Sequence, residues 1–181
     1  MELYDGRPAD TAGRLPREVR TYDYLDSLGI SYQRTDHERA DNMEACNVID
    51  AVLGVVICKN LFLCNRQGTA FYLLMMPGGK KFKTKELSAQ IGSARLSFST
   101  PENMLRLLDI EPGAVSVMGL MNDSGHEVNL LVDEDVLKED YVGCHPCVCT
   151  SSLKLRTKDL IEVFLPATGH GFRMVHLVGE D

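Results

Sequence analysis

A single lysine interrupts a long apolar run of the sequence. Lys59 is the only charged residue between Ala51 and Asn65. An ammonium group is strongly hydrated and is rarely buried without a partner, so an apolar run that keeps one needs an explanation. The run is rich in β-branched residues and predicts a strand, in which alternate residues share a face. Lys59 is therefore expected on an apolar face with Ile57 and Leu61.

Two interpretations of Lys59 follow from this position. At a sheet edge, its alkyl stem would cover apolar surface while its head reaches water, and the charge would protect the edge against aggregation. In a cleft, the same cation would hold an anion such as a phosphate. The apolar run alone is compatible with both.

A second concentration of reactive side chains lies in residues 143–149, where His145 stands among three cysteines. Thiolates and imidazole bind zinc, but four ligands crowded into so short a segment make a tetrahedral site awkward. A cysteine nucleophile activated by His145 is a further option, although neighbours in sequence need not be in hydrogen-bonding geometry. We favour a turn, shaped by Gly143 and Pro146, that presents amides and an imidazole to a ligand. A purely structural turn is the alternative.

Four lysines follow the turn Pro77-Gly78-Gly79; they are Lys80, Lys81, Lys83 and Lys85. The whole chain has a net charge of −7 and a pI near 5.2, which argues against a general nucleic-acid binder with a broad basic surface. The cluster is compatible with a solvated loop and first helical turn, or with a local contact to an RNA backbone.

Length and composition suit one compact domain, since the chain has 181 residues of which 44% are hydrophobic. We expect an irregular N-terminal arm over residues 1–14 and a single domain over 15–181. The six cysteines are expected to be reduced thiols, because several fall in apolar segments. No signal-peptide pattern is visible and the run around Lys59 is too short to cross a bilayer, so we expect no membrane association and a cytoplasmic location.

Apolar periodicity and turn residues predict interleaved helices and strands. Helices are expected at 16–28, 42–53, 83–91, from 100 onward and at 157–165, and strands at 30–34, 55–64, 70–76, 114–120, 128–132, 149–155 and 173–178. The strands at 55–64 and 70–76 should form a hairpin. Connections this short favour antiparallel pairing. We therefore expect a mixed α/β fold, with a largely antiparallel mixed sheet or partly closed barrel flanked by helices.

Three sequence blocks, in order along the chain, carry a family resemblance. They are Cys-Lys-Asn-Leu-Phe-Leu at 58–63, Pro-Gly-Ala-Val-Ser at 112–116 running into Gly-Leu-Met-Asn-Asp at 119–123, and His145-Pro146. With these blocks the sequence resembles the prolyl-tRNA editing family (YbaK-like), free-standing proteins similar to the editing domain inserted in bacterial prolyl-tRNA synthetases. The resemblance extends from Tyr22 to Leu177, most of the chain.

The resemblance implies an α/β editing-domain fold and a deacylase. Such an enzyme hydrolyses the ester between a wrong amino acid, typically alanine, and the tRNA for proline, with no metal, cofactor or covalent intermediate. The implied partner is the acceptor end of a mischarged tRNA. Association with a synthetase or an elongation factor is an option, and the oligomeric state stays open.

The resemblance also implies roles for individual residues. Lys59 matches the family lysine that anchors the phosphate near the terminal adenosine, and His145 matches the histidine of the substrate loop, so both are expected in the catalytic site. The expected substrate-binding residues are Asn60, Ser116, Gly119, Asn122, Gly143 and Pro146. An aminoacyl ester is already activated, so a positioned water and backbone amides that stabilise the oxyanion suffice for hydrolysis.

The sequence departs from the family pattern in three places. Cys149-Thr150 stands where an asparagine-threonine pair is usual, Met118 replaces a phenylalanine, and the segment from Gly143 to Pro146 is one residue shorter than in the inserted domains. The amino acid that is removed is therefore left open. A noncatalytic module that binds an amino acid or aminoacyl ester as a sensor is the main alternative to an enzyme.

Overall fold

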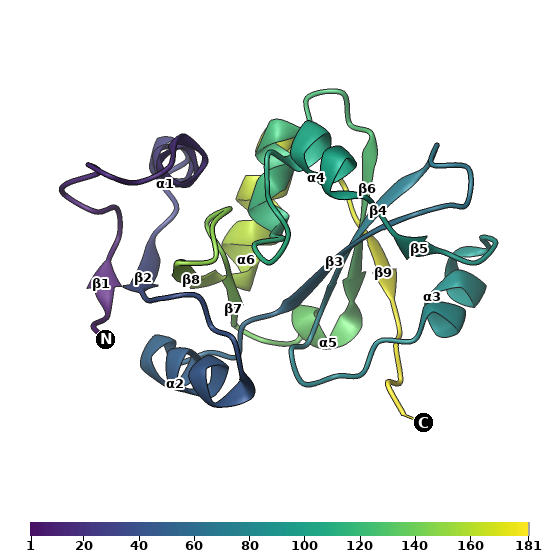
Figure 1. Ribbon diagram of the computed structural model, residues 1–181, viewed down its shortest axis with the longest axis horizontal. Coiled ribbons are helices and arrows are strands. Elements are labelled where there is room, and N and C mark those ends of the chain that lie inside the picture. Colours follow the sequence, from purple (N-terminus) through teal and green to yellow (C-terminus); the bar gives the residue numbers. More distant parts are fainter. Residues whose placement is uncertain (181) are drawn as a thin grey trace.

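Two β-sheets form the frame of the computed structural model, which describes residues 1–180 (Figure 1). The four-stranded sheet has the order β1-β2-β8-β7 and consists of β1 (Tyr4–Asp5), β2 (Tyr32–Asp36), β7 (Tyr141–Cys144) and β8 (Ser151–Arg156). The five-stranded sheet has the order β5-β3-β4-β6-β9 and consists of β3 (Lys59–Cys64), β4 (Phe71–Met76), β5 (Ser97–Phe98), β6 (Val128–Asp133) and β9 (Arg173–Val175).

Most strand pairs are antiparallel. The exceptions are β4 with β6 and β6 with β9, which run parallel. The hairpin of β3 and β4 pairs Lys59 with Met76 and Cys64 with Phe71, as expected. The mixed, largely antiparallel α/β fold is thus confirmed, but the strands divide between two open sheets and do not close into a barrel.

One isolated bridge joins the two sheets and places the two central site residues near each other. Ile57, just before β3, pairs with Gly143 in β7, and the backbone N–H of Cys58 donates to the Gly143 carbonyl at 2.9 Å. A Cβ on Gly143 would lie 3.0 Å from Val55 Cγ1 and 3.1 Å from Ile57 Cα, closer than side chains usually pack, so glycine favours this approach. Lys59 and His145 each follow the bridge by two residues.

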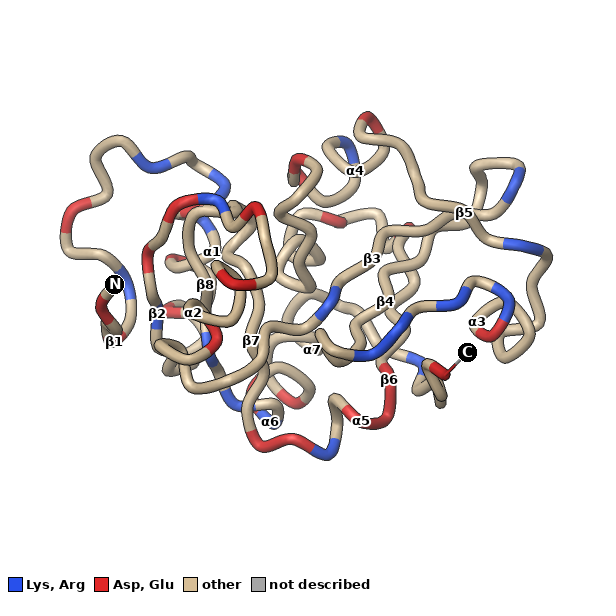
Figure 2. The backbone as a smooth tube through the Cα atoms, turned by 60° about the horizontal axis from the view of Figure 1, so that its bottom comes forward, with Lys and Arg blue, Asp and Glu red and all other residues tan. Residues whose placement is uncertain are grey.

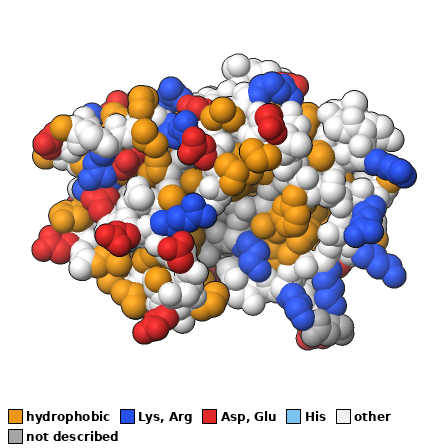
Figure 3. Space-filling model, in the orientation of Figure 1, with side chains coloured by type: hydrophobic (Ala, Val, Ile, Leu, Met, Phe, Trp, Pro, Cys, Tyr) orange, Lys and Arg blue, Asp and Glu red, His pale blue; other side chains and the backbone are white. Residues whose placement is uncertain are grey.

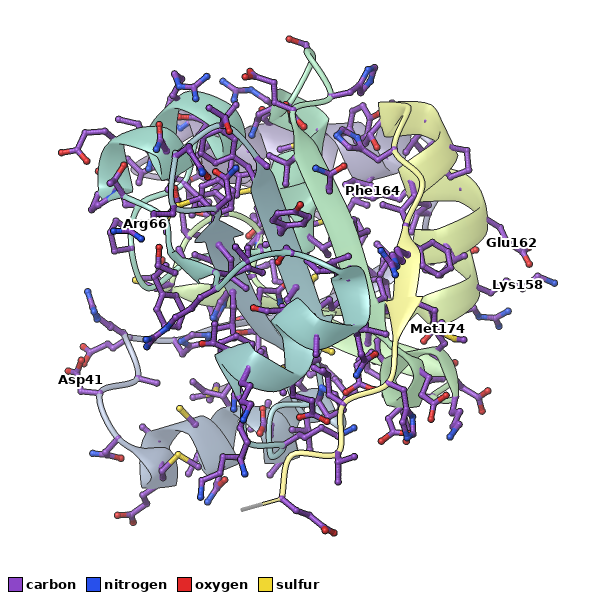
Figure 4. All side chains as sticks on the ribbon, turned by 90° about the vertical axis from the view of Figure 1, so that its right-hand side faces the viewer. Asp41, Arg66, Lys158, Glu162, Phe164 and Met174 are labelled. Atoms are coloured by element: carbon purple, nitrogen blue, oxygen red, sulfur yellow. The ribbon has the colours of Figure 1, made fainter. Side chains whose placement is uncertain are left out.

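Helices flank the two sheets (Figure 1). They are α1 (Pro16–Ser27), α2 (Met43–Leu53), α3 (Thr84–Ile91), α4 (Pro101–Leu108), α5 (Glu134–Leu137) and a C-terminal run of α6 (Thr157–Asp159), η2 (Leu160–Phe164) and α7 (Leu165–Thr168). The Asn42 side chain caps α2 by accepting from the Ala45 N–H, and Thr100 caps α4 in the same way. In the C-terminal run, Phe164 points toward the sheet while Lys158 and Glu162 point away from it (Figure 4).

The five-stranded sheet has a hydrophobic cluster on each face. The larger cluster includes Phe62 of β3 and residues from the other sheet such as Leu153, and the smaller one includes Leu63 together with Leu87 of α3. Successive residues of β3 therefore point to opposite faces, as the alternation predicts. Lys59 lies on the face of the smaller cluster, because it alternates in step with Leu63.

Residues 114–120 do not form the expected strand. Val117–Asn122 form a 3₁₀ helix, η1, whose first turn is capped by the Ser116 side chain. The apolar run is buried on all sides, and a buried run of this length has the same residue pattern in a strand and in a helical turn. The N-terminal arm also contains β1, which pairs with β2. No helix among residues 1–180 is long and apolar enough to span a membrane.

Candidate functional site

A cavity of about 460 Å³ lies between α2, the start of β3 and the turn after β7. Its lining residues come from five parts of the chain: His37, Arg39, Ala40, Met43, Cys46, Asn47, Ile49 and Asp50; Val56, Ile57 and Lys59; Gly78 and Gly79; Gly113; and His145 and Cys149. Figure 3 shows the surface hollowed near the centre of one face, between the two halves of the molecule. Lys59 and His145, which are far apart in sequence, thus line one cavity.

Lys59 lies at an open part of the sheet edge. Along its whole length β3 pairs with β4, but β5 covers the other side only at Leu63 and Cys64. The Lys59 ammonium donates to the backbone carbonyl of Lys80 at 2.6 Å. An ammonium group has three N–H donors, so two are left for a ligand. The sheet-edge and the cleft interpretations therefore both describe this residue.

Lys80 is held inside the protein and fixes the carbonyl that Lys59 uses. Its ammonium donates to Asp133 Oδ2 at 2.8 Å, to Asp135 Oδ2 at 2.7 Å and to the Leu177 carbonyl at 2.7 Å. The side chain of Lys80 is 14% exposed and that of Asp133 is fully buried. The three acceptors saturate the donors of Lys80, so its charge is not offered to RNA as the sequence suggested.

This arrangement gives a testable prediction for stability. We expect Lys80→Met to lower the free energy of unfolding by about 3 kcal/mol, because the buried Asp133 carboxylate loses its counter-ion. Urea denaturation followed by circular dichroism measures the change. The matched control is Lys85→Met on the exposed side of α3, which should change stability by less than about 0.5 kcal/mol. Unchanged stability with weakened RNA binding would return Lys80 to the RNA-contact group.

The tautomer of His145 follows from its partners. Its Nδ1 lies 2.9 Å from the Ser151 carbonyl, which can only accept, so Nδ1 carries the proton and donates. Burial lowers the pKa of His145, and neighbouring His37 lowers it further. The ring is therefore neutral near pH 7 and its Nε2 is a hydrogen-bond acceptor. That nitrogen has no protein partner among the described residues.

His37 is a site residue that no sequence pattern singled out. Its Nδ1 lies 2.8 Å from the Glu38 carbonyl, and its Nε2 lies 2.8 Å from the Ser152 hydroxyl. The same hydroxyl is 3.4 Å from His145 Nδ1, and the two imidazole rings are 6.4 Å apart. Ser152 therefore connects the two histidines across the four-stranded sheet.

Asp50 of α2 also lines the cavity and was not predicted. Its carboxylate accepts from the Ile57 N–H at 3.1 Å, and burial raises its pKa. Asp50 thus ties α2 to the segment that leads into Lys59. A single acidic residue on a helix gives no sequence signal that would have selected Asp50.

Three of the expected substrate-binding residues have structural contacts outside the cavity. Ser116 is fully buried and its hydroxyl accepts from the Met118 N–H at 3.1 Å. A Cβ on Gly119 would lie 2.7 Å from Ile110 Cδ1. The Asn122 amide donates to the Leu108 carbonyl at 2.8 Å. These contacts show that the three residues stabilise η1 and its packing, so we do not place the three residues against the substrate.

The other expected residues lie closer to the site. Asn60 points to the face opposite Lys59; its Nδ2 donates to the Cys58 carbonyl, while its buried Oδ1 has no partner among the described residues. Gly143 permits the bridge between the sheets, and Pro146 is buried directly after His145. Both therefore position the histidine and do not line the cavity themselves.

The cysteines around His145 behave as core residues. All six cysteines of the chain are unpaired, and Cys144 and Cys147 are buried. Burial raises the pKa of Cys147 to about 12, which disfavours the thiolate that a nucleophile or zinc ligand requires. Within the described residues no group of three or more histidine, cysteine or acidic side chains is arranged to hold a metal ion.

The cavity combines a fixed ammonium, a neutral imidazole and a Gly78-Gly79 backbone turn on a two-sheet α/β frame. These groups are a cation, a hydrogen-bond acceptor and backbone donors, which are the kinds of group that bind and polarise an ester. The chain belongs to the aminoacyl-tRNA editing domain family, whose model matches residues 37–163. The resemblance found in the sequence blocks is thereby confirmed, and the family is described by its role in editing aminoacyl-tRNA.

Individual relatives agree with this assignment. The chain is 32% identical over 153 residues to the prolyl-tRNA editing protein ProX of Acetoanaerobium sticklandii, covering 84% of this chain and 93% of the relative. It is 27% identical over 116 residues to a Bos taurus prolyl-tRNA synthetase associated domain-containing protein 1, covering 62% and 67%. A crystal structure of a protein proposed as a trans-editing enzyme for prolyl-tRNA synthetase superposes with a TM-score of 0.67 at 18% identity, over 92% of this chain and 99% of that one. The last comparison supports the fold.

Proposed function

We propose that this protein hydrolyses mischarged tRNA in trans and that its main substrate is the tRNA for proline carrying alanine. The observation that supports the proposal is the meeting of Lys59 and His145 in one cavity of a chain from the editing family. The partner is the acceptor end of the tRNA. Association with a synthetase or an elongation factor stays a prediction.

Lys59 supplies the anchor for the nucleic acid. Its ammonium is held at the cavity by the Lys80 carbonyl and retains two N–H donors. A phosphate oxygen of the terminal nucleotide accepts from them, which places the ester next to the cavity. A charge-assisted bond of this type is shorter and stronger than a neutral one.

His145 and a water molecule carry the chemistry in this proposal. The free Nε2 of His145 accepts a hydrogen bond from the water and orients its oxygen toward the ester carbonyl. As the water oxygen bonds to the carbonyl carbon, His145 Nε2 takes one proton from the water. The bond between the carbonyl carbon and the ribose oxygen then breaks, and the ribose oxygen takes that proton from Nε2. Backbone N–H groups of the Gly78-Gly79 turn are the candidate donors to the oxyanion.

Selectivity for a small amino acid follows from the apolar side chains of the cavity. Met43, Ile49 and Val56 line it together with Lys59 and His145. Exclusion by size discriminates by about 10- to 200-fold per methylene. Alanine is therefore expected to be removed faster than larger amino acids.

The test is a deacylation panel with the purified full chain. Alanyl-tRNA for proline should lose its ester faster than prolyl-tRNA for proline, and faster than alanyl-tRNA for alanine. Hydrolysis no faster than in buffer, across several misacylated tRNAs, would exclude the enzyme. Tight binding of an aminoacyl ester without turnover would instead identify the noncatalytic sensor.

A further inference from the structure

An exposed aromatic residue lies on the same sheet face as Lys59. Phe98 of β5 pairs with Leu63 of β3, and cross-strand partners project to the same face. Leu63 shares that face with Leu61 and Lys59. Four residues of strand separate Lys59 from Leu63, so Phe98 lies about 13 Å from Lys59 along β3.

Phe98 contacts a second aromatic ring but stays open to solvent. Its ring centroid is 6.2 Å from that of Phe82, with the two planes tilted by 65°. Phe82 is partly buried against the smaller core cluster, which fixes it, whereas Phe98 is 63% exposed. A phenylalanine so exposed contributes little to the core, and its surface is available to a flat ligand.

The chain around this aromatic pair is strongly basic in an acidic protein. Residues 59–98 contain seven lysine and arginine side chains and a single acid, Glu86, against a net charge of −7 for the whole chain. The seven are Lys59, Arg66, Lys80, Lys81, Lys83, Lys85 and Arg95, and the ammonium of Lys80 is paired with Asp133 and Asp135. Figure 2 shows basic positions at the start of β3 and on the approach to α3, and the right-hand part of Figure 3 shows basic side chains around exposed apolar surface.

We propose that the unpaired 3′ end of the tRNA runs along this face of β3, with one base stacked on the Phe82 and Phe98 pair. Aromatic side chains beside a positively charged groove are the general means of binding single-stranded nucleic acid. With the terminal phosphate on Lys59, a separation of about 13 Å places the pair next to a nucleotide that precedes the terminal adenosine. This inference rests on the proposed function and adds the RNA subsite to it.

Kinetics with two substrates test the subsite. The full tRNA contains the preceding nucleotides, whereas alanine esterified to adenosine lacks them. We expect Phe98→Ala to raise KM for alanyl-tRNA by about 5- to 100-fold with kcat unchanged, and to leave KM for alanyl-adenosine unchanged. Phe98→Tyr should restore the wild-type KM. The matched control is Phe172→Ala, an exposed phenylalanine beside β9 at the opposite edge of the sheet, which should change neither constant.

Binding provides a readout that does not depend on turnover. An RNA hairpin ending in unpaired CCA, with 2-aminopurine replacing the base before the terminal adenosine, should lose fluorescence on binding to the wild-type protein, and not on binding to Phe98→Ala. An unchanged KM for tRNA, an equal rise for both substrates, or the same quenching in the variant would overturn the subsite. Quenching without any hydrolysis would retain the subsite and reject the proposed function.

Discussion

Lys59→Met should lower kcat/KM for alanyl-tRNA by about 10- to 100-fold. The substitution keeps the length and apolar stem of the side chain and removes only the ammonium, whose charge-assisted bond to a phosphate contributes about 1.5–3 kcal/mol. Steady-state deacylation measures the loss. The salt dependence gives a second measurement, since the slope of log KM against log salt should become shallower by about one unit.

The fold should survive this substitution. Lys59 is partly exposed and its one hydrogen bond is to a carbonyl that Lys80 holds in place independently. Thermal unfolding of Lys59→Met should therefore match that of the wild type. Lys85→Met provides the comparison, because it removes an exposed charge from the same basic region without touching the cavity. Turnover that is equal in wild type and Lys59→Met would remove Lys59 from the site.

Elements with local signals were predictable from the sequence, and elements defined by distant partners were not. Asn42 and Thr100 mark the starts of α2 and α4 because a cap bonds only to residues two or three positions away. The short strands β1, β5 and β7 have two to four residues, too few for an alternating pattern, and exist because a longer strand pairs with them. The parallel pairing of β4 with β6 depends on residues more than fifty positions apart.

The residues of the candidate site also divide into those with a local sequence signal and those defined by distant partners. Lys59 stands out because a charge in an apolar strand contradicts its surroundings, and that contradiction is visible without a structure. His145 was selected through the resemblance, since the residues alone left several roles open. His37 and Asp50 carry no local anomaly, because a polar residue in a loop or at a helix surface is ordinary. Contacts with distant residues bring them to the cavity, through Thr150 and Ser152 for His37 and through the Ile57 N–H for Asp50.

His145→Gln should lower kcat by about 10²-fold with a smaller effect on KM, because Nε2 acts on the water and not on the phosphate. Glutamine retains a donor for the Ser151 carbonyl, so the turn should stay folded. The measurement is single-turnover deacylation at saturating enzyme. A raised KM with an unchanged single-turnover rate constant would assign His145 to substrate binding alone.

The pH dependence separates this role from a structural one. Burial lowers the pKa of His145, so its active neutral form persists below the usual value of about 6.5, and kcat should stay level from pH 8 to 6.5 and fall only below that. His37→Gln should move this fall to higher pH, because the charge of His37 contributes to the lowered pKa. The other titratable groups lining the cavity are Cys46, Asp50, Lys59, Arg39 and Cys149. A fall that persists unchanged in His145→Gln would assign it to one of them.

The free energy of unfolding should also depend on the protonation of His145. The unfolded chain binds a proton at His145 near pH 6.5, whereas the folded chain binds it only at lower pH, so the unfolded state takes up more protons as the pH decreases through this window. The contribution of His145 to the free energy of unfolding is therefore fully present above about pH 6.5 and is lost as the pH falls through the lowered pKa. Urea denaturation between pH 5 and 8 should show this decrease in the wild type and a smaller one in His145→Gln. Equal decreases in both proteins would mean that His145 is not the buried neutral imidazole on which the proposed chemistry depends.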